Sequence, residues 1–127
     1  MGDSRTYLFR EGELRQITKD HSLVQHQVDQ GIITATEARS HAMKNIVLRA
    51  LGVDPSLSLD IVRGRVMPED LFLLCSDGLT DMLDDVEIGK ILASGLTIGE
   101  KVDKLISCAI TAGGKDNVTA VLCQAVA

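Results

Sequence analysis

The sequence predicts an α+β domain in which the strands are mostly antiparallel. Residues 5–10 and 14–18 are rich in β-forming side chains and flank Gly12, which is the pattern of a β-hairpin. Residues 97–112 carry apolar side chains at helical spacing, and a β-rich segment over residues 117–125 follows two glycines that would stop the helix. The complete pattern is four or five strands and several helices in one layered domain.

The region from residue 22 to residue 44 is more polar than its flanks and predicts a helical excursion from the sheet. Its first helix would end at Gly31, because glycine adopts left-handed backbone at little cost. Its second helix opens on a capping box, in which Thr34 and Glu37 satisfy each other's backbone N–H groups. The first predicted helix spans residues 23–30 and is capped by Ser22 or Asp20. The second runs from the capping box at Thr34 to about His41.

The middle of the chain predicts two strands that are separated by a turn. Residues 52–55 have turn composition, and residues 57–66 alternate apolar and polar side chains for most of their length. That alternation is typical of a strand that is buried on one face. After a second turn at residues 67–70, the continuous apolar run at residues 71–75 indicates a central strand buried on both faces.

The remaining helices and the domain count follow from local signals. Residues 80–83 form a short turn, and Asp84 or Asp85 can cap a helix over residues 86–93. The chain has 127 residues and shows no internal repeat, low-complexity tract or linker. That length is sufficient for one domain with a single hydrophobic core.

The composition argues against several classes of binding protein. Thirteen basic and 18 acidic residues give a net charge of −5, so no nucleic-acid partner is expected. With two Phe, one Tyr and no Trp, a stacking platform for single-stranded nucleic acid is not expected either. No apolar run approaches membrane-spanning length and no secretory signal is apparent, so no membrane partner is expected.

The three cysteines, Cys75, Cys108 and Cys123, are odd in number and lie inside apolar runs. We expect them to be buried, reduced thiols. Reduced thiols are typical of a cytoplasmic protein, and the cytoplasm is the predicted location. No CxxC pair in the sequence suggests a zinc site or a redox role.

Three aspartates lie at the ends of predicted strands. Asp3 precedes the first strand, Asp77 follows the apolar strand, and Asp116 precedes the last one. If the middle strand is antiparallel to the other two, all three carboxylates lie at the same end of the sheet. Carboxylates gathered in one place attract hard cations such as Mg²⁺ and Mn²⁺. The alternative for Asp77 and Asp116 is turn chemistry, because Asp-Gly and Asp-Asn pairs are common in turns, and Asp3 could merely close off a chain end.

Five motifs in order resemble the C-terminal half of the PP2C (PPM) family of metal-dependent protein phosphatases, the bacterial type in particular. The motifs are residues 2–5 (GDSR), 20–22 (DHS), 48–52 (LRALG), 73–81 (LLCSDGLTD) and 114–119 (GKDNVT). The resemblance extends over the whole chain. It implies part of an α-β-β-α layered sandwich with mostly antiparallel sheets, and a centre of two Mn²⁺ or Mg²⁺ ions at one end of that sandwich.

The resemblance also implies roles for individual residues. Asp77 and Asp116 resemble the late ligands of the two-metal centre. Asp3 resembles a ligand of the additional, third metal ion of bacterial members, which it shares with Asp77. The supporting residues implied by the motifs are Ser76, Gly78 and Asn117. The polar region 22–44 corresponds to a flap beside the active site.

The implied reaction is hydrolysis of phosphoserine and phosphothreonine in proteins, which would be substrates of a serine/threonine kinase. A water activated by the metal ions would attack phosphorus in line with the leaving oxygen. His21 could act as a general acid, although a lone histidine of this kind is more often a structural hydrogen-bonding residue. Arg49 is expected to pair with a nearby carboxylate, with a phosphate contact as the alternative.

The sequence departs from the family pattern in one major respect. The early acidic motif, the Asp-Gly pair that bridges two metals and the nearby phosphate-binding arginine of the family's N-terminal half are absent from these residues. We therefore expect little or no phosphatase activity from the 127-residue chain alone. Exposed apolar faces could lead it to pair with a second copy or with the missing half. The alternative function is a non-catalytic module that binds a partner or a phosphoprotein.

Overall fold

The computed structural model describes residues 2–52, 55–56 and 58–126. These residues form two compact units. The described residues of the first unit come from segments 2–4 and 19–61, and those of the second from segments 5–18 and 62–126. The second unit holds both the hydrophobic core and the sheet.

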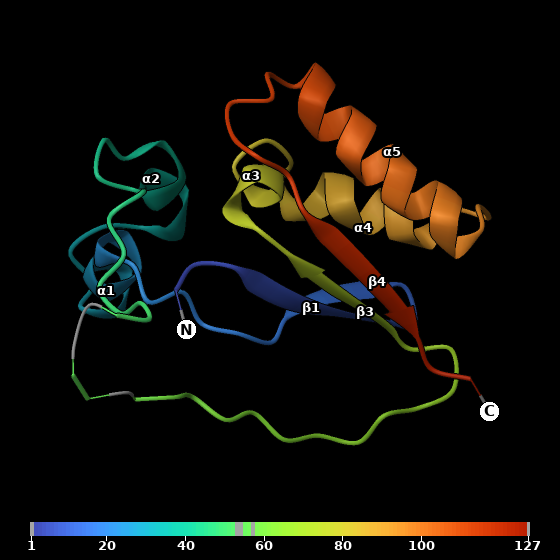
Figure 1. The fold of residues 1–127 in the computed structure, drawn as a ribbon, viewed down its shortest axis with the longest axis horizontal. Coiled ribbons are helices and arrows are strands. Elements are labelled where there is room, and N and C mark those ends of the chain that lie inside the picture. The colour runs from blue at the N-terminus through green and yellow to red at the C-terminus, as the bar shows by residue number, and fades with distance from the viewer. Residues whose placement is uncertain (1, 53–54, 57, 127) are drawn as a thin grey trace. The chain divides into compact units, whose positions relative to one another are not determined.

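The sheet of the second unit has four strands in the order β2-β1-β3-β4, and every neighbouring pair is antiparallel. Figure 1 shows β1, β3 and β4 side by side. The predicted antiparallel arrangement is therefore confirmed, with β3 in an inner position. The strands are β1 (Arg5–Arg10), β2 (Glu13–Gln16), β3 (Leu71–Cys75) and β4 (Ala120–Gln124).

The hairpin of β1 and β2 turns on two residues in the left-handed region. Glu11 has φ 52° and Gly12 has φ 84°. Such a turn matches the right-handed twist of the two strands that it joins. The predicted hairpin is confirmed, although β2 begins and ends earlier than residues 14–18.

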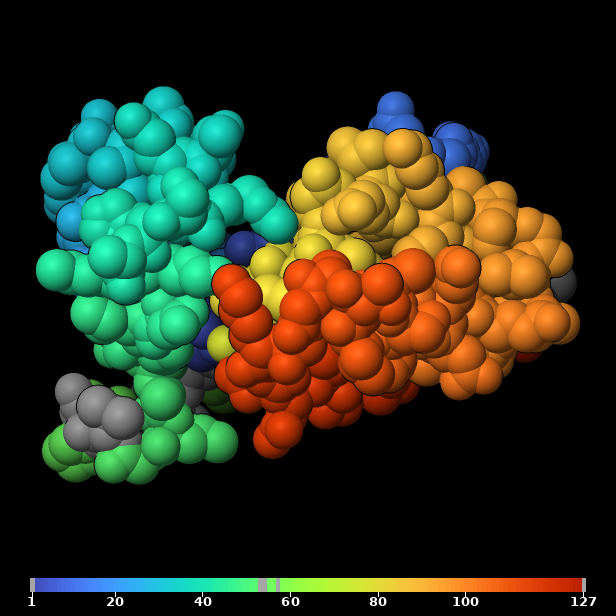
Figure 2. All heavy atoms as spheres, turned by 90° about the horizontal axis from the view of Figure 1, so that it is seen from above, coloured from blue at the N-terminus to red at the C-terminus, as the bar shows by residue number. Residues whose placement is uncertain are grey.

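Three helices of the second unit cover one face of this sheet. In Figure 1 they lie over the sheet, and in Figure 2 the atoms of α4 (gold) and α5 (orange) lie side by side. The N-termini of α4 and α5 are fixed by local hydrogen bonds, since Asp84 forms a capping box with Glu87, and Thr97 does so with Glu100. The helices are α3 (Asp77–Thr80), α4 (Asp85–Ala93) and α5 (Ile98–Thr111).

Only one face of β3 is fully buried. The side chains of Leu71, Leu73 and Cys75 point into the core, where Leu73 is 0% exposed. Leu74, on the opposite face, is 44% exposed. The prediction that this strand is buried on both faces is therefore wrong, because within the described part of the chain the helices cover the sheet from one side.

The predicted strand over residues 57–66 is also wrong. Leu57 lies outside the described residues, as do Val53 and Asp54 of the turn predicted before it. Residues 58–66 form no strand, and Figure 1 draws them as plain coil. The apolar side chains of Leu59, Ile61 and Val66 are 60%, 75% and 64% exposed. The sequence supplies strand-forming alternation here, but the described residues supply no neighbouring strand.

The first unit contains the two helices predicted for the polar region. In α1 (Leu23–Asp29) the N-cap is Ser22, whose Oγ accepts a hydrogen bond from the backbone N–H of Gln25. The second helix, α2 (Ala35–Ser40), opens on the predicted capping box of Thr34 and Glu37. Both helices are therefore where their local capping signals placed them.

The cysteines differ in exposure. Cys75 is buried, Cys108 is partly exposed and Cys123 is exposed, and all three are free thiols. Burial of all three was expected and holds only for Cys75, because Cys123 lies on the sheet face opposite the helices. Among the described residues, no helix has the length and apolar character that crossing a bilayer would require.

Candidate functional site

Two loops of the second unit are joined at one end of the sheet. The register of β3 and β4 pairs Cys75 with Ala120, so the segment after β3 lies beside the segment before β4. The backbone N–H of Ser76 donates to the carbonyl oxygen of Thr119 at 3.1 Å, and the N–H of Thr119 donates to Oγ of Ser76 at 3.1 Å. The Ser76 hydroxyl also donates to the carbonyl oxygen of Asn117 at 3.3 Å. Residues 76 and 117–119 therefore form one hydrogen-bonded cluster.

Gly78 permits the closest approach between these loops. Gly78 is buried, and the carbonyl group of Asn117 occupies the position that a Cβ atom on Gly78 would need. The obstructing atoms belong to the backbone, so they cannot move away as the end of a flexible side chain could. A larger residue at position 78 would therefore push the two loops apart.

The two aspartates predicted as metal ligands flank this cluster. Asp77 is the first residue of α3, directly between Ser76 and Gly78, and it is partly exposed. Asp116 is exposed and directly precedes Asn117, whose backbone N–H donates to Asp116 Oδ1 at 2.6 Å. Both carboxylates thus belong to loops that meet at one end of the sheet, as the antiparallel topology predicts.

The chemistry of this donor set suits a hard divalent cation. Carboxylate oxygens are the ligands that Mg²⁺ and Mn²⁺ prefer, and Mg²⁺ is commonly held by one or two carboxylates while water molecules complete its shell. Within residues 2–52, 55–56 and 58–126, no group of three or more His, Cys, Asp or Glu side chains is placed to hold a metal ion. The oxygen chemistry of Asp77 and Asp116 suits part of a metal site, and the assignment of both as ligands stays a prediction.

Asp3 lies in the first unit. It is partly buried and follows Gly2, whose carbonyl oxygen accepts a hydrogen bond from the backbone N–H of His21 at 2.9 Å. This bond ties the segment before β1 to the segment before α1. The role of Asp3 as a ligand of an additional metal ion stays a prediction.

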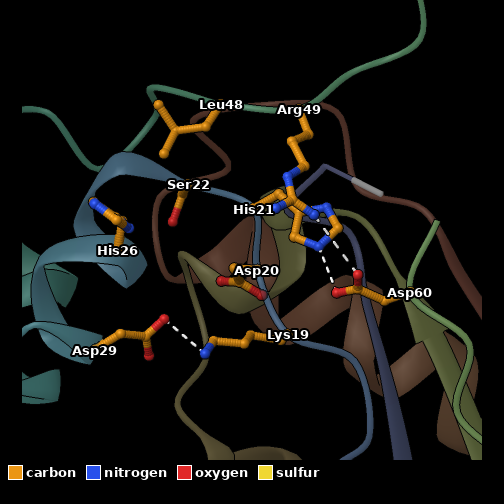
Figure 3. Close-up of a pocket in the computed structure, with 9 residues that line it drawn as sticks. All are labelled: Lys19, Asp20, His21, Ser22, His26, Asp29, Leu48, Arg49 and Asp60. Atoms are coloured by element: carbon orange, nitrogen blue, oxygen red, sulfur yellow. Dashed lines mark hydrogen bonds and ion pairs between the residues drawn. The ribbon is translucent and has the colours of Figure 1, made fainter. Parts of the chain in front are cut away.

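A charged pocket of about 260 Å³ lies within the first unit (Figure 3). An ion pair and a hydrogen bond line it: Lys19 Nζ lies 2.6 Å from Asp29 Oδ2, and His21 Nε2 lies 2.7 Å from Asp60 Oδ2. Arg49 also approaches Asp60, at 3.7 Å. The basic and acidic groups are therefore largely paired with each other. The lining residues are Lys19, Asp20, His21, Ser22, His26, Asp29, Leu48, Arg49 and Asp60.

His21 has a structural role in this pocket. Its side chain is only 8% exposed, and its carbonyl oxygen accepts a hydrogen bond from the backbone N–H of Leu48 at 2.7 Å. The hydrogen bond from the imidazole also holds the pKa of Asp60 below its usual value. These contacts support the structural interpretation of His21 over a role as general acid.

Arg49 pairs with a carboxylate, as the sequence predicts, and the partner is Asp60. Sequence reasoning missed Asp60 because it lies inside the segment predicted as a strand. A lone carboxylate among apolar residues was the only signal. It does not identify His21, 39 positions earlier in the sequence, as a hydrogen-bond partner.

Comparison with known proteins gives the family. No protein-family model matches the chain. The serine/threonine phosphatase stp of Listeria monocytogenes is 44% identical over 124 residues, which are 98% of this chain and 49% of that protein. The structure of the serine/threonine phosphatase Stp1 from Staphylococcus aureus is similar with a TM-score of 0.90 at 37% identity, covering 99% of this chain and 50% of the other. By homology, the chain belongs to the PP2C (PPM) phosphatases.

This PP2C homologue spans about half the length of curated relatives that it matches, 49% of the Listeria monocytogenes phosphatase and 50% of the protein phosphatase PhpP of Streptococcus pneumoniae. The α+β, PP2C-like fold class predicted from the sequence is confirmed by these structural neighbours. A further neighbour is the catalytic domain of the serine/threonine protein phosphatase PstP, with a TM-score of 0.79 at 42% identity, covering 100% of this chain and 52% of the other. That PstP structure is described as a complex with two manganese ions.

Proposed function

We propose that the chain is the C-terminal half of a phosphatase domain that hydrolyses phosphoserine and phosphothreonine in proteins. The observation that carries this proposal is the cluster at one end of the sheet, where the loops of Asp77 and Asp116 are bonded together. The homologues named as serine/threonine phosphatases support it.

Each residue of the cluster has a proposed task. Asp77 and Asp116 hold two Mn²⁺ or Mg²⁺ ions through their carboxylates, and Asp3 contributes to an additional ion. Ser76, Gly78 and Asn117 position the two carboxylates through the contacts described above. When bound there, the ions would lower the pKa of a water molecule and neutralise charge on the phosphoryl oxygens.

The proposal includes the surroundings of the reaction. The substrates are phosphorylated proteins, the products of a serine/threonine kinase, and the location is the cytoplasm. Residues 22–44, which contain α1 and α2, act as a flap that affects substrate access. The second candidate is a non-catalytic module that binds a partner or a phosphoprotein, and the incomplete ligand set in the described part of the chain favours it for this piece alone.

Calorimetric titration of the chain with Mn²⁺ tests the metal assignment directly. We expect weak binding by the wild-type chain and loss of the heat signal in Asp77→Asn and in Asp116→Asn. The matched control is Asp103→Asn, which removes the same charge from an exposed position in α5 and should leave the titration unchanged.

Two results would contradict the proposal. Identical isotherms for wild type and Asp77→Asn would show that Asp77 is not a metal ligand in this chain. Turnover of a phosphopeptide by the purified 127-residue chain at the rate of a whole phosphatase would show that the chain needs no other half.

A further inference from the structure

A buried tyrosine hydroxyl joins the start of β1 to the start of α4 in the second unit. Tyr7 is 0% exposed, and its hydroxyl donates a hydrogen bond to Oδ1 of Asp85 at 3.0 Å. Nη1 of Arg5 donates to the same hydroxyl oxygen at 2.9 Å. Because Arg5 occupies a lone pair of that oxygen, the hydroxyl hydrogen is directed toward Asp85. The three side chains therefore form one ordered hydrogen-bonded network.

The surroundings of this hydroxyl keep it protonated. Burial raises the pKa of Tyr7 well above its usual value of 10, although the nearby Arg5 guanidinium acts in the opposite direction. The hydroxyl is therefore a permanent donor to Asp85 near neutral pH, and the contact depends on the presence of the Tyr7 oxygen and not on a change of charge.

The network closes a short segment of the chain that begins at Asp77. Asp77 is the first residue of α3, and Asp85 is the first residue of α4. Figure 1 shows α3 between the end of β3 and the start of α4. At the other end of this segment, the strand register pairs Arg5 with Cys75, the last residue of β3. β1 is therefore attached to both ends of the segment that contains α3, by strand pairing at one end and by Tyr7 at the other.

The segment between these two attachments is packed and hydrogen-bonded along its length. Leu79 and Leu83 are 0% and 3% exposed, so both side chains belong to the core. The backbone N–H of Asp81 donates to the carbonyl oxygen of Asp77 at 2.8 Å, and the N–H of Leu83 donates to that of Leu79 at 2.9 Å. A change at Asp85 would therefore reach Asp77 through contiguous contacts instead of being absorbed by a flexible loop.

We propose that Tyr7 is a positioning residue for metal binding: its hydroxyl holds Asp85, and thereby α3, so that a divalent cation can bind Asp77. The carbonyl group of Asn117 limits the position of Gly78 from the segment before β4, and the Tyr7 hydroxyl supports the same helix from β1. A ligand held by such supports is already in place when the ion arrives, and loss of a support lowers the affinity. The proposal rests on the metal role proposed for Asp77.

The variant Tyr7→Phe tests this proposal, because it removes the hydroxyl and keeps the buried ring. Binding of Mn²⁺ to the 127-residue chain would be followed by NMR, through the paramagnetic loss of the amide signals of residues 76–79. We expect the Kd to rise about tenfold, the lower end of the effect of losing a group that supports a metal ligand. In the metal-free chain, exchange of the Asp81 amide hydrogen should quicken about tenfold relative to that of Leu73 in the inner strand β3.

Variants of Asp85 test whether the effect arises from the hydroxyl contact. Asp85→Ala removes the acceptor and should weaken Mn²⁺ binding as much as Tyr7→Phe does. Asp85→Asn keeps Oδ1 as an acceptor and should stay close to wild type. Combining Tyr7→Phe with Asp85→Ala should weaken binding no further than either change alone, as expected for two partners in one interaction.

The control for a general loss of stability is Thr97→Ala, which breaks the N-cap of α5 and should leave Mn²⁺ binding unchanged. If Tyr7→Phe and Thr97→Ala weaken binding equally, the hydroxyl contributes only stability and the proposal is wrong. It is also wrong if Tyr7→Phe leaves both the Kd and the exchange of Asp81 as in wild type. Failure of the wild-type chain to bind Mn²⁺ contradicts the metal role of Asp77 instead, and the exchange of Asp81 still shows whether the hydroxyl holds α3.

Discussion

The carbonyl group of Asn117 fills the space that a side chain on Gly78 would occupy. This relationship fixes the distance between the loop after β3 and the loop before β4, and both loops carry a predicted metal ligand. The chemistry proposed for Asp77 and Asp116 therefore depends on a position that has no side chain of its own.

Replacement of Gly78 by alanine should separate the two loops. We expect Gly78→Ala to lower the free energy of unfolding by about 1–3 kcal/mol, the usual cost of overpacking, although alanine is the better helix former. Urea unfolding followed by circular dichroism measures this. Gly89→Ala in α4 is the control, because its new Cβ would lie 3.7 Å from Leu14 Cβ, an ordinary contact. It should stabilise the chain by up to about 1 kcal/mol, and equal losses in both variants would contradict the steric argument.

Two adjacent leucines in β3 test the one-sided core. Leu73→Ala should cost about 2–5 kcal/mol, because the side chain is fully buried against the helices and its removal leaves a cavity. Leu74→Ala, at a site that is 44% exposed, should cost less than about 1 kcal/mol. Denaturant unfolding of both variants gives the comparison. A large loss in Leu74→Ala would mean that the sheet face opposite the helices is packed in solution.

The buried carboxylate of Asp70 predicts a loss of stability in acid. Arg10 donates to both of its oxygens, at 2.7 and 2.6 Å, and this contact holds the pKa of Asp70 at about 2, assisted by the backbone N–H of Met67. A pKa that is lower in the folded state stabilises the protein above the unfolded value of 3.8, and this stabilisation disappears as the pH falls from about 4 to about 2.

The variant Asp70→Asn should be less stable than wild type at neutral pH and should lose less stability between pH 4 and pH 2. Thermal unfolding across that pH range measures both effects. Asp103→Asn, at an exposed position, should follow the wild-type profile. If wild type and Asp70→Asn show the same acid profile, the ion pair does not contribute to the pH dependence.

The capping box of α5 predicts a local contribution to stability. Thr97 Oγ1 accepts from the backbone N–H of Glu100, so Thr97→Ala leaves that group without its side-chain partner and should cost about 1 kcal/mol. Thr111→Ala, at the other end of the same helix, removes a threonine without affecting an N-cap and should change stability by less than about 0.5 kcal/mol. Guanidinium unfolding distinguishes the two, and equal values would contradict the capping argument.

The helices could be predicted because their signals are local. Thr34 and Glu37 form a capping box from residues three positions apart, and Ser22 caps α1 by accepting from the backbone N–H of Gln25, also three positions on. The strand predicted over residues 57–66 failed for the opposite reason. Alternating polarity makes a segment suitable for a sheet, but a strand exists only where a neighbour pairs with it, and that information lies elsewhere in the sequence.

The candidate site was predictable to the same extent. Few strand arrangements were compatible with the sequence, and one of them was antiparallel pairing of β3 with β1 and β4. This pairing brings the loops of Asp77 and Asp116 to one end of the sheet. The pocket around His21 and Asp60 could not be predicted, because its groups come from segments whose contacts are set by tertiary packing. The exposure of one face of β3 could not be predicted either, since an apolar run gives no indication of how many layers will cover it.

The strand order has a consequence for synthesis of the chain on a ribosome. β1 and β2 are consecutive and can pair early, but the next neighbour of β1 begins only at Leu71. At a translation rate of about 5–20 residues per second, the hairpin would wait roughly 3–12 s for that neighbour. During this interval β3, α3, α4 and α5 are not yet synthesised, so Tyr7, which is 0% exposed in the folded unit, lacks the neighbours that bury it there.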